Sequence, residues 1–275
     1  MNRYPLLFLF LCTVGHAQQQ HGFDVILRHG SIVDGTGAPP HRADVAIVRG
    51  YIAEIGDLST AVAPLDLNVD GLVVAPGFLN IHSHAVPDAL PTAENMLTQG
   101  VTTEILNPDG GGSTDIKEQL SRFSSRGLAL NIGAYIGFNS VWSSVMGATD
   151  HRPSDDDIQA MRNMIARGLE DGAWGVSAGL DYKPAYFART DEVIRILQPA
   201  AIWRTNFPNH DRVTPETNYS SLAGMTETIE IGEKAGLVPV ITHMKVQGHE
   251  QGRAAAIIDK MRQASASGHY TAADV

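Results

Sequence analysis

The sequence predicts an α/β protein in which a small antiparallel β unit precedes a larger region of parallel strands and helices. Two observations predict this. Between Phe23 and Val74 the chain has short β-like runs separated by Gly-rich turns. After Pro76-Gly77 the pattern changes to alternating strands and helices, which is typical of a parallel sheet. We therefore place a domain boundary between residues 22–75 and residues 76–275.

The first region predicts four strands. Apolar and β-branched residues cover Phe23–Leu27, Ser31–Val33, Ala43–Val48 and Tyr51–Ile55. The segments Asp34-Gly-Thr-Gly37 and Arg49-Gly50 between them carry the residues that turns favour.

The second region predicts seven strands with helices between them. The strand candidates are Phe78–His84, Val101–Leu106, Ala129–Ile136, Ala173–Ala178, Ile202–Asn206, Val238–His243 and His269–Val275. Ser154-Asp-Asp-Asp157 resembles a capping box at a helix start, and Gly100, Gly172, Gly236 and Gly268 stand where helices should end. Seven such strands are one short of a (β/α)8 TIM barrel, so we expect an incomplete barrel that ends within its seventh strand.

Composition narrows the class of partner. The chain has 275 residues, 43% of them hydrophobic, which suits a packed globular protein. Its formal net charge is −10 and no basic run is present, which argues against nucleic acid and against an anionic membrane surface. We expect a small-molecule substrate, and the sequence gives no indication of the oligomeric state.

The N-terminus predicts a signal peptide over residues 1–17. Met1-Asn-Arg3 is a short positive segment, Tyr4–Val14 is apolar, and Gly15-His-Ala17 places small residues at a cleavage site. We expect an exported protein, periplasmic or secreted, whose mature form has no membrane segment. Cys12 is the only cysteine and lies inside this segment, so the mature chain would have neither disulfides nor thiolate metal ligands.

His82 and His84 form a His-x-His motif at the end of the first parallel strand. Residues i and i+2 of a strand share a face, so both imidazoles point the same way, as two ligands of zinc would. By itself the motif favours a solvated or hydrogen-bonded histidine pair over a metal site. In a barrel, however, His210 after the fifth strand and His243 at the end of the sixth lie on the same rim.

The chain resembles the amidohydrolase superfamily and, within it, the N-acyl-D-amino-acid deacylases (D-aminoacylases). Six stretches carry the resemblance, in order along the chain. They are Asp24–Gly37 (DVILRHGSIVDGTG), Val74–His84 (VAPGFLNIHSH), Gly100–Thr103 (GVTT), Gly175–Pro184 (GVSAGLDYKP), Val240–Val246 (VITHMKV) and Thr271–Val275 (TAADV).

The resemblance implies a β-sandwich part beside a metal-bearing barrel, with one or two zinc ions. It implies hydrolysis of the amide bond of N-acyl-D-amino acids by metal-activated water. His82, His84 and His243 match the family's ligands, and His210 matches in position although its loop departs from the family wording. The general base of relatives is an aspartate on strand eight, so we expect it beyond Val275.

Three further residues enter through the resemblance. Many relatives carry a cysteine or a glutamate ligand after the Gly-Val-Thr-Thr strand, and counting from Gly100 puts Asp109 there. Asp109 could instead stabilise a Gly-rich turn. Lys245 shares a face with His243, where it could receive a substrate carboxylate or remain a solvated loop lysine. Tyr182 occupies a substrate-side position by resemblance, or it serves packing.

Two alternatives stay open. A cyclic-amidase or dipeptidase-type amidohydrolase often uses a carboxylated lysine on strand four, and Ala173–Ala178 contains no lysine. The other alternative is a truncated chain without catalytic activity, because strand eight and its aspartate are absent from these residues. We expect the isolated 275 residues to be inactive.

Overall fold

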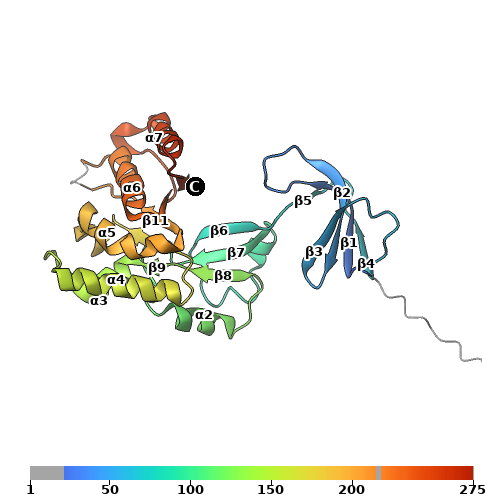
Figure 1. Ribbon diagram of the computed structural model, residues 1–275, viewed down its shortest axis with the longest axis horizontal. Helices are drawn as coiled ribbons and strands as arrows, with labels where there is room; N and C mark the ends of the chain where they lie inside the picture. Colours follow the sequence, from blue (N-terminus) through green and yellow to red (C-terminus); the bar gives the residue numbers. More distant parts are fainter. Residues whose placement is uncertain (1–21, 215–217, 275) are drawn as a thin grey trace, which may run out of the picture. The chain divides into compact units, whose positions relative to one another are not determined.

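The computed structural model describes residues 22–214 and 218–274 (Figure 1). The chain divides into two compact units, with the boundary between Pro76 and Gly77. The predicted signal peptide, residues 1–17, lies outside the described residues. No helix within the described ranges combines the length and the apolar character needed to cross a membrane. Each unit is described by itself.

The described residues of the first unit form one five-stranded sheet. Its strands are β1 (Val25–Ile32), β2 (His41–Val48), β3 (Tyr51–Gly56), β4 (Leu65–Asn68) and β5 (Val73–Val74). The antiparallel prediction holds for β1–β2 and β2–β3. Strands β4 and β5 were not among the four predicted strands, and both pair with β1 in parallel, so the unit is not purely antiparallel. The segment after β3 crosses over before β4 begins, so β4 runs in the same direction as β1.

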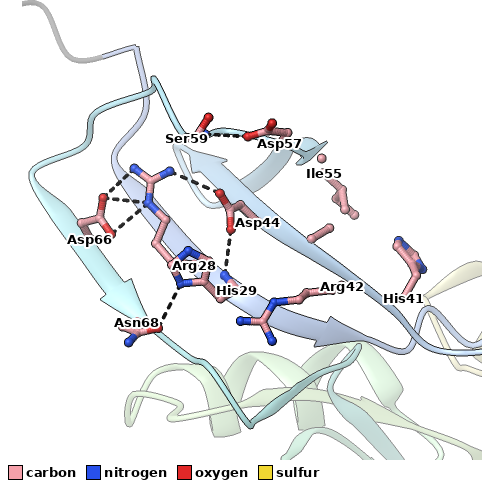
Figure 2. A pocket seen from close by; sticks show the side chains of 12 residues that line it. Arg28, His29, His41, Arg42, Asp44, Ile55, Asp57, Ser59, Asp66 and Asn68 are labelled. Carbon is pink, nitrogen blue, oxygen red and sulfur yellow. Dashed lines mark hydrogen bonds and ion pairs between the residues drawn. The ribbon is translucent and has the colours of Figure 1, made fainter.

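The side chain of Arg28 ties this unit together (Figure 2). Its Nε donates to both carboxylate oxygens of Asp66 at 3.1 and 3.0 Å, and its Nη1 donates to Asp44 at 3.3 Å and to the Leu58 carbonyl at 2.5 Å. Its Nη2 donates to the Ala61 carbonyl at 2.8 Å and to Asp66 at 2.7 Å. All five N–H groups of the guanidinium are therefore used within the fold. A cavity of about 870 Å³ lies beside Arg28, and Asp44 and Asp66, which bind the guanidinium, are among its lining residues.

The second unit is built from parallel strands. They are β6 (Phe78–Ser83), β7 (Val101–Leu106), β8 (Asn131–Ala134), β9 (Ile136–Gly137), β10 (Val176–Gly179), β11 (Asn206–His210), β12 (Val238–Ile241) and β13 (Ala272–Ala273). One sheet has the order β6-β7-β8 and the other β13-β12-β11-β10-β9. Only Tyr135 separates β8 from β9, so these two strands form one nearly continuous extended segment. Counted in this way, the eight strands correspond to seven strand positions.

The seven positions follow the predicted order, with differences at the ends. The fifth strand was predicted over Ile202–Asn206, but β11 begins at Asn206 because Gln198–Trp203 forms a 3-10 helix. His210 is therefore the last residue of a strand and does not follow one. The seventh strand, predicted over His269–Val275, is reduced to Ala272–Ala273 within the described residues.

Seven α-helices accompany these strands within the described residues. They are α1 (Glu94–Leu97), α2 (Ile116–Ser124), α3 (Phe138–Met146), α4 (Asp155–Glu170), α5 (Thr190–Leu197), α6 (Ser221–Ala235) and α7 (Ala254–Ala266). The predicted capping box is present, since Ser154 Oγ accepts from the Asp157 N–H and Asp157 accepts from the Ser154 N–H. Gly100, Gly172, Gly236 and Gly268 all have positive φ just after helices, as predicted.

The core of the second unit lies between its sheets and its helices. Phe138 and Trp142 of α3 and Met161 and Ile165 of α4 are fully buried and belong to one cluster with Ile136 of β9. In Figure 1, α3, α4 and α5 lie side by side along these strands. This packing fixes the strands whose carboxyl ends carry the candidate site.

The carboxylate of Asp44 makes the stability of the first unit sensitive to acid. The His29 N–H bonded to Asp44 at 2.7 Å, together with Arg28, outweighs burial and lowers the pKa of this carboxyl. A lowered folded-state pKa stabilises the fold above the ordinary value of about 3.9, and that stability is lost as pH falls through the folded-state pKa. We predict that Asp44→Asn lowers the melting temperature at neutral pH and that its deficit shrinks at about pH 3.

Thermal melts followed by circular dichroism at both pH values test this prediction. Asp70→Asn is the control, because the Asp70–Arg42 pair has side chains 56% and 64% exposed and should contribute little. An equal deficit for Asp44→Asn at both pH values would contradict the prediction.

Candidate metal centre

The carboxyl ends of four parallel strands bring the predicted ligands to one place. His82 lies in β6 and His84 directly after it, Asp109 follows β7, His210 ends β11, and His243 follows β12. β6 and β7 are neighbours in one sheet and β11 and β12 are neighbours in the other, so the fold brings the carboxyl ends of two strand pairs together although they are far apart in sequence.

The five donors form a continuous cluster. Nε2 of His84 lies 3.3 Å from Nε2 of His82 and 3.2 Å from Oδ2 of Asp109. Oδ1 of Asp109 lies 3.7 Å from Nε2 of His82 and 3.8 Å from Nδ1 of His210. Nε2 of His243 lies 3.0 Å from Nδ1 of His210. Asp109 therefore stands between one histidine pair on β6 and another on β11 and β12.

This donor set fits a divalent metal ion. One ligand atom each from His82, Asp109 and His243 lies within 4.8 Å of the others. Oδ1 of Asp109 is buried and has no hydrogen-bond partner among the described residues, so an acceptor faces the cluster unsatisfied. Ligands about 2.0–2.1 Å from a tetrahedral zinc are about 3.3 Å apart, close to the nitrogen–nitrogen distances between these imidazoles. Imidazole and carboxylate donors suit zinc and related metals.

At His243 and Asp109 the surroundings favour the protonation state that binds metal. Burial lowers the pKa of His243, and the nearby His210 and Lys245 lower it further, which favours the neutral imidazole. Burial raises the pKa of the Asp109 carboxyl, but the adjacent His210, His82 and His84 outweigh burial and lower that pKa, which keeps a carboxylate.

Asp274 is a residue of the cluster that the sequence reasoning missed. Its Oδ2 lies 3.2 Å from Nδ1 of His82, and its Oδ1 accepts from the backbone N–H of His243. A hydrogen on Nδ1 of His82 leaves Nε2 free toward Asp109 and His84. Burial lowers the pKa of His82, but the bond to Asp274 and the charges of Asp274 and Asp109 raise it overall. The signal available in sequence was position, since Asp274 directly follows the seventh strand.

Lys245 and Tyr182 also lie at the cluster. Nζ of Lys245 is 3.1 Å from Nδ1 of His243, and the Tyr182 hydroxyl is 2.8 Å from Nδ1 of His210. Burial, followed by the charges of Asp109 and Asp181, raises the pKa of Tyr182, so its hydroxyl keeps its proton. All seven residues singled out from sequence are thus brought together by the fold.

A cavity opens next to the donors. It has a volume of about 350 Å³ and adjoins His84 and Asp109. Ala85, Leu106 and Phe123 are among its lining residues, so part of its wall is apolar. A small molecule in this cavity would lie against the donors.

No family model matches the chain. The chain is 32% identical to a D-aminoacylase of Alcaligenes xylosoxydans xylosoxydans over 251 residues, which cover 82% of this chain and 51% of that protein. The chain is a homologue of the D-aminoacylases. This confirms the resemblance found in the motifs, and the chain spans about half the length of this D-aminoacylase.

Solved structures agree. An N-acyl-D-glutamate deacylase of Bordetella bronchiseptica, complexed with zinc and a phosphonate inhibitor that mimics the tetrahedral intermediate, superposes with a TM-score of 0.83 at 27% identity. The match covers 92% of this chain and 58% of that one. A D-aminoacylase described as defining a novel subset of amidohydrolases superposes with a TM-score of 0.81 at 28% identity, again over 92% and 58% of the two chains. The parallel α/β architecture is therefore that of the D-aminoacylase homologues.

Asp274 gives a test of the metal centre. We predict that Asp274→Ala weakens zinc binding about 10- to 100-fold, because His82 loses the partner that orients its ring. Competition with a chromophoric chelator measures the affinity. Asp259→Ala is the control, because Asp259 pairs only with the exposed Arg262 on α7 among the described residues and should leave the affinity unchanged. Equal affinity of Asp274→Ala and the unmodified protein would refute the orienting role.

Proposed function

We propose that this protein is a zinc-dependent deacylase that hydrolyses the amide bond of N-acyl-D-amino acids. The observation that carries the proposal is the cluster of four histidines and Asp109 at the carboxyl ends of parallel strands, in a homologue of the D-aminoacylases. The relatives named for N-acyl-D-glutamate and N-acyl-D-aspartate deacylase support the same class of substrate.

In this proposal His82, His84, His210 and His243 hold one or two zinc ions, and Asp109 lies between the two pairs. When bound, zinc supplies a Lewis acid that acidifies water and polarises an amide carbonyl. The carboxylate of Asp109 offsets positive charge at the centre of the cluster. Asp274 holds His82 in the tautomer whose Nε2 faces Asp109.

The substrate is held by residues around the donors. The ammonium of Lys245 receives the substrate carboxylate, and its position 3.1 Å from His243 brings that carboxylate beside the donors. The Tyr182 hydroxyl donates to a substrate oxygen from the His210 side. The apolar wall formed by Leu106 and Phe123 accommodates the uncharged part of the substrate.

The fold belongs to the same proposal. The seven parallel strand positions form most of a (β/α)8 barrel, and the first unit forms part of a β-sandwich.

Hydrolysis of N-acetyl-D-amino acids tests the function. We predict zinc-dependent release of the free amino acid, faster for D than for L isomers, that is abolished by a chelator and restored by zinc. The assay compares the 275-residue chain, which we expect to be inactive, with the product of the same reading frame translated past the codon for Val275, in which we expect the activity. His243→Asn should remove activity, whereas His249→Asn, a change outside the donor cluster, should retain it. Absence of hydrolysis by both products in the presence of zinc would overturn the proposal.

Lys245 provides the substrate test. We predict that Lys245→Met raises KM about 10- to 100-fold with a smaller change in kcat, because a charge-assisted hydrogen bond to the bound substrate is worth about 1.5–3 kcal/mol. Steady-state kinetics of the active product measure both constants. Lys260→Met on α7 is the control, and an unchanged KM in Lys245→Met would assign substrate binding elsewhere.

A further inference from the structure

We propose that the hydroxyl of Ser177 is the positioning group that holds Asp109 in the metal centre. The inference rests on the proposed metal function and adds a residue on β10 that contributes no ligand. Ser177 is fully buried within β10.

The Ser177 hydroxyl ties both ends of the segment that presents Asp109. Its Oγ donates to the carbonyl of Asn107 at 2.6 Å and accepts from the N–H of Gly110 at 3.1 Å. Asn107 and Gly110 flank Pro108 and Asp109, so one hydroxyl closes a four-residue turn around the carboxylate. Among the described residues, no other side chain bonds to the backbone at both ends of this turn.

The turn has little freedom apart from this hydroxyl. Asn107 has a φ of +63° and Gly110 a φ of +78°, so both residues occupy the left-handed region. A Cβ on Gly110 would meet Oδ1 of Asn139 at 2.1 Å, and a Cβ on Gly137 would meet the Gly110 carbonyl at 2.1 Å. The backbone of the turn is therefore seated directly against β9 and the start of α3.

The side chain of Asn139, which packs against Gly110, is bonded to β10. Its side-chain amide donates to the Gly179 carbonyl at 2.9 Å, and its Oδ1 accepts from the Gly179 N–H at 2.9 Å. Ser177 and Gly179 lie two residues apart on β10, so the strand that bonds the turn through Ser177 also holds the Asn139 side chain that packs against Gly110. The position of Asp109 thus depends on β10 although Asp109 follows β7.

The unsatisfied carboxylate oxygen explains why such a hold is needed. Oδ1 of Asp109 is buried without a hydrogen-bond partner among the described residues, and an exposed carboxylate would be better solvated. Without the hydroxyl, the Asn107 carbonyl and the Gly110 N–H would each lose a buried partner. The turn would keep its packing against β9 and α3 but lose its bonds to β10, so the carboxylate of Asp109 would be held less firmly beside His82 and His210.

The test is a double-mutant cycle with cobalt(II) as the probe metal. The proteins are the unmodified chain, Ser177→Ala, Asp109→Asn and the double variant, and the readouts are the dissociation constant and the visible spectrum of the cobalt complex. We expect Ser177→Ala to raise the dissociation constant about tenfold or more and to shift the spectrum toward that of Asp109→Asn. In the Asp109→Asn background, Ser177→Ala should change the constant less than about twofold.

Ser221→Ala is the matched control. Ser221 is also fully buried, and its hydroxyl accepts a single backbone bond from the Gln247 N–H at 3.2 Å, away from Asp109. This variant should lose thermal stability without changing the cobalt affinity. Ser177→Cys replaces the hydroxyl with a somewhat larger group that is a weaker donor, so it should show an intermediate affinity and serves if Ser177→Ala does not fold.

The outcomes separate the two proposals. If the unmodified protein binds neither cobalt nor zinc, the proposed function fails and this inference fails with it. If it binds cobalt and the Ser177 variants bind equally well, only the positioning role is overturned. The same holds if Ser177→Ala weakens binding as much in the Asp109→Asn background as in the unmodified one.

Discussion

The site depends on one geometric constraint, which is that the parallel strands of two sheets bring their carboxyl ends to one place. His82 and His243 are separated by most of the second unit in sequence, yet their ring centroids lie 5.4 Å apart. The helices and the buried core between these strands determine the spacing of the strand ends. The ligands themselves contribute little to this arrangement, since a cluster of imidazoles around one carboxylate gains no apolar burial. Bringing the donors together costs free energy because they lose hydration, and the packing of the scaffold offsets that cost.

Asp109 is the electrostatic centre of that arrangement. It lies within 4.0 Å of His82, His84 and His210, and it is the charge that most directly favours a cation at this point. Its turn is the part of the site that is least determined by the strand order, because a loop after β7 has many possible paths. The bonds to Ser177 and the close approach of Gly110 to Asn139 select one of these paths. Strand order thus places the histidines, and contacts across β9 and β10 place the carboxylate.

Much of the fold was predictable because it follows from local pattern. The alternation of strands and helices, the capping box at Ser154 and the glycines after the helices depend on neighbouring residues. The fifth strand was misplaced because apolar Ile202 and Trp203 resemble a strand, whereas Pro199 and the adjacent residues form a 3-10 helix. Strands β4 and β5 were not predicted, because four and two residues are too few to give a clear strand pattern, and their parallel pairing depends on a crossover that no short pattern records.

The candidate site divides in the same way. His82 and His84 could be found from spacing, and the remaining donors from their places at strand ends together with the resemblance. Asp274 and Ser177 could not be recognised so readily, because their importance lies in what they contact. Asp274 reaches a histidine 192 positions away in sequence, and Ser177 binds the backbone of residues some 70 positions away. Hydrogen bonds of this kind leave no periodicity in the sequence.

The absence of thiolate from the donor set has a further physical consequence. The only cysteine of the sequence is Cys12, so the cluster consists of imidazoles and a carboxylate. A thiolate would favour softer metals and is open to oxidation to sulfenic and higher acids. A carboxylate favours harder metals and is not oxidised in this way. A carboxylate is also more strongly hydrated than a thiolate, so keeping it in a partly buried cluster requires firmer support from its surroundings. The hydroxyl of Ser177 and the close packing at Gly110 supply that support, which links the identity of the ligand to the structure of the turn that carries it.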